Sequence, residues 1–184
     1  MENFNKTMSD DDLFYLMLYS DMETMTNICL MRKINHCHDP YFWKLKFNLD
    51  KLPILTSDSP KTFNEWRAEY RRVDQAQNKA LEMIDELQQN AIIFHYNDEQ
   101  MNFKKILSMK LRSALQNYTP NYQKFNRLGI SYNFKRNVYD VNIRGYQVAD
   151  IDINADELYP ILMIIFYHYP AIPYTLIPYK YRRF

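Results

Sequence analysis

The pattern of apolar and polar positions divides the chain into a helical half and a half with strand periodicity. Between residues 9 and 50, short amphipathic segments follow one another, and from residue 62 apolar residues recur at alternating spacings of three and four. From Leu128 the period changes to two. The pattern therefore predicts an α+β fold, with a helical N-terminal half and a small antiparallel three-stranded sheet covered by a C-terminal helix.

Side-chain caps are expected at the starts of the first three segments. Ser9 and Asp12 have the spacing of a capping box. Asp21 can accept backbone N–H bonds at the start of the second segment, and Asp39, followed directly by proline, suits the start of the third. These signals predict a three-helix module over residues 9–50.

Within this module, groups of residues follow one another in a recognisable order: Leu13, Leu16-Met17, Asp21, Met25, Ile28-Cys29-Leu30-Met31 and Asp39-Pro40-Tyr41-Phe42-Trp43. This order resembles an F-box, the helical module that docks a protein onto the Skp adaptor of a cullin ubiquitin ligase. The run Tyr-Phe-Trp-Lys-Leu-Lys-Phe at 41–47 is similar to F-box proteins encoded by large DNA viruses. Met8-Ser9 stands where the family has Leu-Pro.

The resemblance implies a non-enzymatic adaptor that binds the Skp component and presents a target protein for ubiquitination. It would act inside the cell, in the cytoplasm or nucleus of a host. The module has more apolar surface than three short helices need for one another. The residues expected to contact the partner are Leu13, Leu16, Met17, Met25, Ile28, Leu30 and Trp43.

Two other functions are compatible with the sequence. The main alternative is a viral or structural interaction module whose helical stripe builds a complex without ubiquitin-ligase machinery. A weaker alternative is nucleic-acid binding through the basic, aromatic end at 180–184.

Long helices are predicted over residues 62–118. The first runs from residue 62 to 91, and its apolar stripe is thin because it includes Gln77 and two alanines. It is therefore expected to pack within its own domain, with a coiled coil to another chain as the alternative. Residues 92–96 either finish this helix or turn away from it, and a second helix is expected over 97–118.

The region 128–184 is predicted to form the sheet, its covering helix and a tail. Two-residue hairpin turns are expected at Arg136-Asn137 and Arg144-Gly145. Asn154 with Glu157 indicates a helix start, and Pro160 either kinks this helix or marks its true beginning.

The outer face and the tail of this region are further candidates for contact. Tyr146, Val148, Asp150 and Asp152 would share the second face of the last strand, and target recognition is placed between residues 128 and 184. The tail after residue 169 is expected to be extended, lying on the domain or along an edge of the sheet, or binding a partner.

Composition excludes several classes of function. A net charge of +1 gives no global preference for nucleic acid or an anionic membrane. The longest apolar run, at 161–167, is shorter than the ~20 residues of a membrane helix. Cys29 and Cys37 could bridge, but free thiols in a reducing compartment are the expectation.

Motifs for catalysis and cofactor binding are missing from the sequence. Gly129 and Gly145 are the two glycines, so phosphate-cradling loops are excluded, and no cofactor is expected. His36-Cys37-His38 lacks a second ligand pair, so no metal is expected. An acidic group including Asp150 and Asp152 is interpreted as a solvated strand face.

Overall fold

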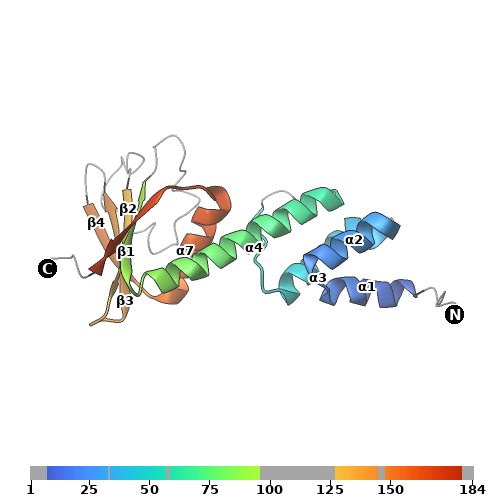
Figure 1. Ribbon diagram of the computed structural model, residues 1–184, viewed down its shortest axis with the longest axis horizontal. Coiled ribbons are helices and arrows are strands. Elements are labelled where there is room, and N and C mark those ends of the chain that lie inside the picture. The colour runs from blue at the N-terminus through green and yellow to red at the C-terminus, as the bar shows by residue number, and fades with distance from the viewer. Residues whose placement is uncertain (1–7, 33, 57–58, 96–126, 145–147, 180–184) are drawn as a thin grey trace. The chain divides into compact units, whose positions relative to one another are not determined.

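The chain forms two units, Met1–Val73 and Asp74–Phe184, which are described in turn. The computed structural model of the protein describes residues 8–32, 34–56, 59–95, 127–144 and 148–179. The first unit is helical, and the second combines helices with an antiparallel sheet (Figure 1). The predicted α+β class is confirmed, whereas the helix expected over 97–118 lies outside the described residues.

The first unit contains the predicted three-helix module. Its elements are α1 (Asp10–Tyr19), α2 (Met22–Arg32), the 3-10 helix η1 (Asn35–His38) and α3 (Pro40–Leu49). The Ser9 hydroxyl accepts the Asp12 N–H at 3.1 Å, and an Asp21 carboxylate oxygen accepts the Thr24 N–H at 2.7 Å. Asp39 caps α3 in the same way. All three predicted caps are confirmed.

Stacked tryptophans form the centre of the first unit. The ring of Trp43 on α3 lies parallel to that of Trp66 on α4 (Phe63–Glu86), with centroids 5.8 Å apart. Both rings are buried, and Phe47 packs edge-on against Trp66. Leu49 is exposed, because the Trp43 side faces α4.

A disulfide joins Cys29 at the end of α2 to Cys37 in η1. The expectation of free thiols is therefore wrong. Both side chains are buried, and their Cα atoms lie 5.9 Å apart, within the range a disulfide can bridge. The reason is spatial: the turn after α2 folds back on that helix, which sequence spacing alone does not reveal. The sequence argument for a reducing compartment loses its basis.

Helix α4 begins in the first unit and ends in the second. Its start has the geometry of a capping box, in which Thr62 and Glu65 exchange hydrogen bonds. A stripe of the helix at spacings of three and four is buried, and Leu87 directly after the helix continues it: Trp66, Glu69, Val73, Ala76, Ala80 and Met83. The helix ends at Glu86 instead of residue 91, because the next apolar residues form a strand.

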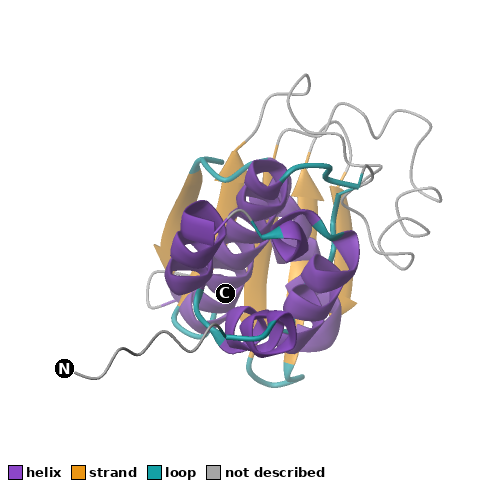
Figure 2. Cartoon of the chain, turned by 90° about the vertical axis from the view of Figure 1, so that its right-hand side faces the viewer, coloured by secondary structure: helices purple, strands orange, loops and turns teal. Residues whose placement is uncertain are grey.

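Within the described residues the sheet has five strands, not the predicted three. They are β1 (Asn90–His95), β2 (Arg127–Asn133), β3 (Val138–Arg144), β4 (Val148–Ile153) and β5 (Tyr174–Pro178). Their order is β4-β3-β2-β1-β5, every pair is antiparallel, and the strands lie side by side in Figure 2. The predicted strands are β2, β3 and β4. β1 and β5 add to this meander from distant parts of the chain.

The loop between β2 and β3 is longer than predicted. Asn133 pairs with Val138, so the loop comprises residues 134–137 and not a two-residue turn at Arg136-Asn137. Asn137 takes a φ of 54°, a left-handed conformation that asparagine tolerates better than most residues. The turn expected at Arg144-Gly145 extends outside the described residues.

Helix α7 (Ala155–His168) covers one face of the sheet (Figure 1). Asn154 and Glu157 form the predicted capping box, and the helix continues through Pro160. Its inward residues are Leu158, Ile161, Leu162, Ile165 and Phe166. The Phe166 ring packs edge-on against Phe94 of β1 at 5.9 Å. Across the described ranges, no helix combines the length and apolar character that a bilayer span requires.

The two stacked tryptophans should differ in their response to the same substitution. Trp43 Nε1 donates to the Cys37 carbonyl at 2.9 Å, whereas Trp66 Nε1 has no hydrogen-bond partner among the described residues. Trp43→Phe should therefore cost about 1–3 kcal/mol more unfolding free energy than Trp66→Phe, because it leaves a buried carbonyl unpaired. Urea unfolding of both variants measures the difference, and equal costs would contradict the assignment.

Candidate interaction surfaces

Helix α1 exposes apolar side chains on the face that its own unit does not cover. Residues 13–19 are apolar without interruption, which a short amphipathic helix does not need. One side packs inward, where Leu13, Met17 and Leu18 are buried. The other side presents Tyr15, Leu16 and Tyr19, here called the α1 patch, and Leu16 is 43% exposed.

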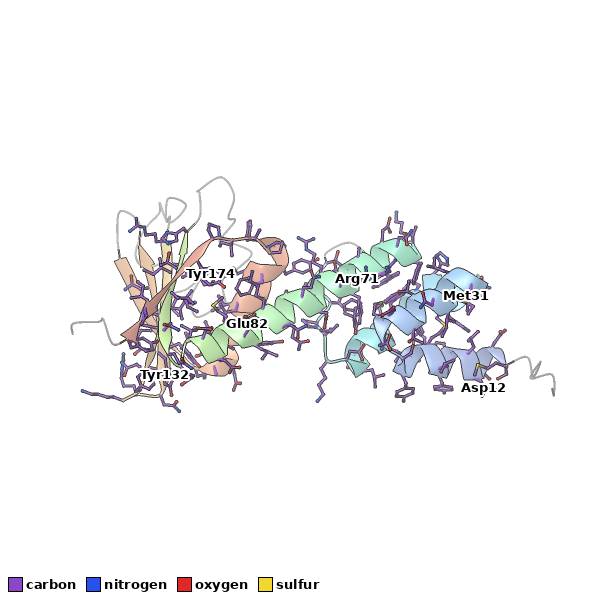
Figure 3. The ribbon with its side chains drawn as sticks, in the orientation of Figure 1. Asp12, Met31, Arg71, Glu82, Tyr132 and Tyr174 are labelled. Atoms are coloured by element: carbon purple, nitrogen blue, oxygen red, sulfur yellow. A yellow bond between two sulfur atoms is a disulfide. The ribbon has the colours of Figure 1, made fainter. Side chains whose placement is uncertain are left out.

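A second apolar group lies at the end of α2. Leu30 and Met31, here called the α2 patch, are both exposed, and Met31 at 81% is the more exposed of the two (Figure 3). A hollow of about 420 Å³ lies beside Leu30, and its lining includes the disulfide and Phe63. The exposed apolar side chains at this end of α2 therefore lie next to a concave surface.

The predicted partner-contact residues divide between interior and surface. Leu13, Met17, Met25 and Trp43 are buried, Ile28 is half-buried, and Leu16 and Leu30 are exposed. The buried residues of this set pack in the core of the first unit and are not accessible to a partner. The sequence analysis missed Tyr15, Tyr19 and Met31 as surface residues, although an uninterrupted apolar run was a usable signal.

A buried lysine fixes the corner between α1 and α2. Lys46 of α3 is 3% exposed, and its Nζ donates to the Leu18 carbonyl at 3.0 Å and to the Ser20 carbonyl at 2.7 Å. These carbonyls belong to the end of α1, where a cation also complements the negative end of the helix dipole. The α1 patch therefore lies on a helix whose C-terminal end is fixed by the hydrogen bonds from Lys46.

The charge of Lys46 is balanced by Asp50, whose carboxylate lies 3.0 Å from Nζ. The Tyr70 hydroxyl of α4 donates to the same carboxylate at 2.6 Å. A buried ion pair needs such additional hydrogen bonds to offset its desolvation. The sequence analysis did not single out Lys46, although its spacing from Phe42 and Trp43 put it on the buried side of α3.

The cluster at residues 36–38 is committed to structural contacts. Cys37 is in the disulfide, His38 Nδ1 lies 3.3 Å from the Phe63 N–H that donates to it, and the His36 ring packs against Phe14. Within the described ranges, no group of three or more His, Cys, Asp or Glu residues could hold a metal ion.

The face of the sheet turned away from α7, here called the outer face, is a second candidate surface. Ser131, Asp140 and Asp152 stand opposite one another on β2, β3 and β4. A hollow of about 780 Å³ lies over them, with Arg127 and Asn142 also in its lining. Of the four residues predicted to share this face, Tyr146 lies outside the described residues.

Register supports part of that prediction. Asp152 pairs with Asp140 on the outer face, whereas Tyr139 and Ile153, the next pair along the strands, are buried on the opposite face. The outer face is therefore polar where the opposite face is apolar.

An arginine joins the two facing aspartates of the outer face. Arg136 from the β2–β3 loop donates to Asp140 at 2.7 Å and also forms an ion pair with Asp152. Burial raises the pKa of the Asp140 carboxyl, and its hydrogen bond with Asp152 raises it further, whereas Asn133 and Arg136 act in the opposite direction. The net effect is a raised pKa of Asp140, so this carboxyl holds its charge less readily than an isolated aspartate does.

Comparison with protein-family models, with curated proteins and with solved structures finds no match to this chain.

Replacing Lys46 should destabilise the first unit strongly. Lys46→Met leaves the Asp50 carboxylate and two carbonyls of α1 without their buried donor, so we expect a loss of about 3 kcal/mol in unfolding free energy. Lys44, two residues away and exposed, is the matched control. Lys44→Met should change stability by less than about 0.5 kcal/mol. Similar losses in both variants would show that the Lys46 network contributes little.

Asp140→Asn should change how stability depends on pH. A carboxyl whose pKa is raised by folding stabilises the fold below its unfolded pKa, and this contribution is lost as pH rises through the folded value. Asparagine mimics the protonated acid. The variant should therefore equal or exceed the wild type in melting temperature near neutral pH, with the difference shrinking on acidification. A constant deficit at every pH would contradict this assignment.

Proposed function

We propose that the protein is an F-box-like adaptor whose helical unit binds the Skp component of a cullin ubiquitin ligase. One observation carries the proposal: the unit exposes the α1 and α2 patches although its own core is complete. Met17, Met25, Phe42, Trp43 and Phe47 already fill that core. Exposed apolar side chains on a finished core are typical of a protein–protein contact surface.

The order of sequence features supports the same proposal. The segment that resembles the end of an F-box, from Asp39 to Trp43, forms a capped helix with Trp43 in the core of the unit. In such a module the buried residues set the helix positions, and the exposed ones make the contact. Leu16 and Leu30 are the predicted contact residues that are accessible.

The proposed role needs binding and no catalysis. The second unit would present the target protein, and its outer face offers a hollow lined by Arg127, Arg136, Asp140 and Asp152 for that contact. Charged groups of both signs favour a protein segment that carries charged side chains, and Ile93 and Ile177 in the same lining would contact its apolar atoms. The adaptor would work in the cytoplasm or nucleus, where a cullin ligase acts and where the Cys29–Cys37 disulfide would meet reducing conditions.

Leu16→Asp should weaken binding to the purified Skp adaptor by about 2–4 kcal/mol, because the contact would bury an unpaired carboxylate. Leu16 is exposed, so circular dichroism of the free variant should match the wild type. Isothermal titration calorimetry measures the affinity.

The matched control is Leu81→Asp, which places the same charge at an exposed leucine of α4 in the second unit. Leu81→Asp should bind like the wild type. Equal affinities of Leu16→Asp and wild type, or no binding by the wild type, would refute the adaptor role. The second outcome would favour an interaction module that acts without ubiquitin-ligase machinery.

A further inference from the structure

Strand β5 forms one edge of the sheet. It pairs with β1 on its inner side, and among the described residues no strand pairs with its outer side. Tyr174 and Leu176 are 39% and 40% exposed. An accessible edge strand offers a row of backbone donors and acceptors to another strand.

The backbone hydrogen bonds show which groups of β5 face outward. The His95 N–H donates to the Pro173 carbonyl at 2.9 Å, and the Tyr179 N–H donates to the Gln89 carbonyl at 3.4 Å. In an antiparallel pair, hydrogen-bonded positions alternate along the strand. Thr175 therefore directs its backbone groups toward β1, as Pro173 and Tyr179 do.

The alternate residues direct their backbone groups away from the sheet. Tyr174 and Leu176 each present an N–H and a carbonyl outward, and Pro178 presents a carbonyl. Only an extended polypeptide has donors and acceptors at the matching spacing.

Side-chain contacts hold this edge in place at both ends. The Tyr179 hydroxyl donates to the Leu87 carbonyl at 2.8 Å and accepts the Tyr132 N–H at 2.7 Å. At the other end the Tyr174 ring packs on Phe94 at 6.0 Å. The edge is therefore preorganised, so a second strand would pay little to order it.

The two edges of the sheet differ in charge. β5 reads Tyr-Thr-Leu-Ile-Pro and has no charged residue, whereas β4 contains Asp150 and Asp152. Charged side chains are a common device that keeps an edge strand from pairing with another molecule. β4 carries this device. β5 has no charged residue, and its Pro178 removes one outward N–H but leaves those of Tyr174 and Leu176, so β5 is the edge that permits association.

We propose that β5 pairs antiparallel with β5 of a second copy of this chain, about a twofold axis at Leu176. In that register each Leu176 N–H donates to the Leu176 carbonyl of the other copy. Each Tyr174 N–H donates to the other copy's Pro178 carbonyl. Tyr174 and Pro178 are equally distant from Leu176, so they lie opposite each other in this register, and every outward N–H of the strand finds a carbonyl. The Tyr174 carbonyl has no donor opposite it, because Pro178 lacks an N–H.

The side chains favour the same register. Residues opposite each other across an antiparallel pair share a face, so Leu176 would contact its own copy and Tyr174 would contact Pro178. These contacts would bury the exposed apolar surface of β5. Within residues 174–178 of β5, a second copy meets no like charge. The proposal is independent of Skp binding, which involves the other unit.

Sedimentation equilibrium of the full chain tests the proposal. The wild type should show a concentration-dependent dimer. Leu176→Pro removes the outward N–H while leaving the hydrogen bonds to β1, and proline is tolerated on an edge strand. We expect it to weaken the dimer at least about tenfold more than Leu176→Ala, which keeps the N–H. Leu81→Ala, at another exposed leucine, should not change dimerisation.

Oxidative cross-linking tests the register without altering the backbone. Directly opposed hydrogen-bonded residues have Cα atoms about 5.5 Å apart, a distance that a disulfide can bridge. Leu176→Cys should therefore form a covalent dimer, and Leu81→Cys should not. The native cysteines are already paired with each other. A wild type that stays monomeric, or a cross-link through Thr175→Cys but not Leu176→Cys, would overturn the proposal.

Discussion

The burial of the Lys46 ammonium group is the constraint that fixes the helical unit. An ammonium held away from water must find acceptors, and it finds them in the last carbonyls of α1 and in Asp50. The same network reaches α4 through the Tyr70 hydroxyl. The Lys46 ammonium group thereby connects α1, α3 and α4. These hydrogen bonds also fix the orientation of α1 and hence the direction in which Leu16 is exposed.

Local chemistry made the helix starts predictable. Ser9, Asp21 and Asn154 cap helices as expected, because a capping side chain bonds to backbone only a few residues away. The alternation from residue 128 likewise predicted β2 to β4, since adjacent strands in a meander pair through short connections. The uninterrupted apolar run of α1 indicated that some of its residues must be exposed, but its pattern did not show which ones.

Features that depend on distant partners were not predictable. The apolar run of β1 is too short to be distinguished from a helix end by its period. β5 follows Pro173 and ends with Pro178, and these prolines argue against a strand until its edge position is known. The Cys29–Cys37 bond could not be predicted because it depends on η1 folding back against α2. For Lys46, two signals in the sequence disagreed. A lysine is usually exposed, whereas its spacing from Phe42 and Trp43 along the helix placed it on the buried side.

The two edges of the sheet differ in charge, and this difference determines how many copies of the chain could join edge to edge. A twofold contact uses the same surface on both copies, so joining two chains through β5 consumes the uncharged edge of each. What remains at either end of the combined sheet is β4, where Asp152 is exposed. The association would be closed, yielding a discrete particle, and the aspartate-bearing ends would prevent the end-to-end stacking from which filaments grow.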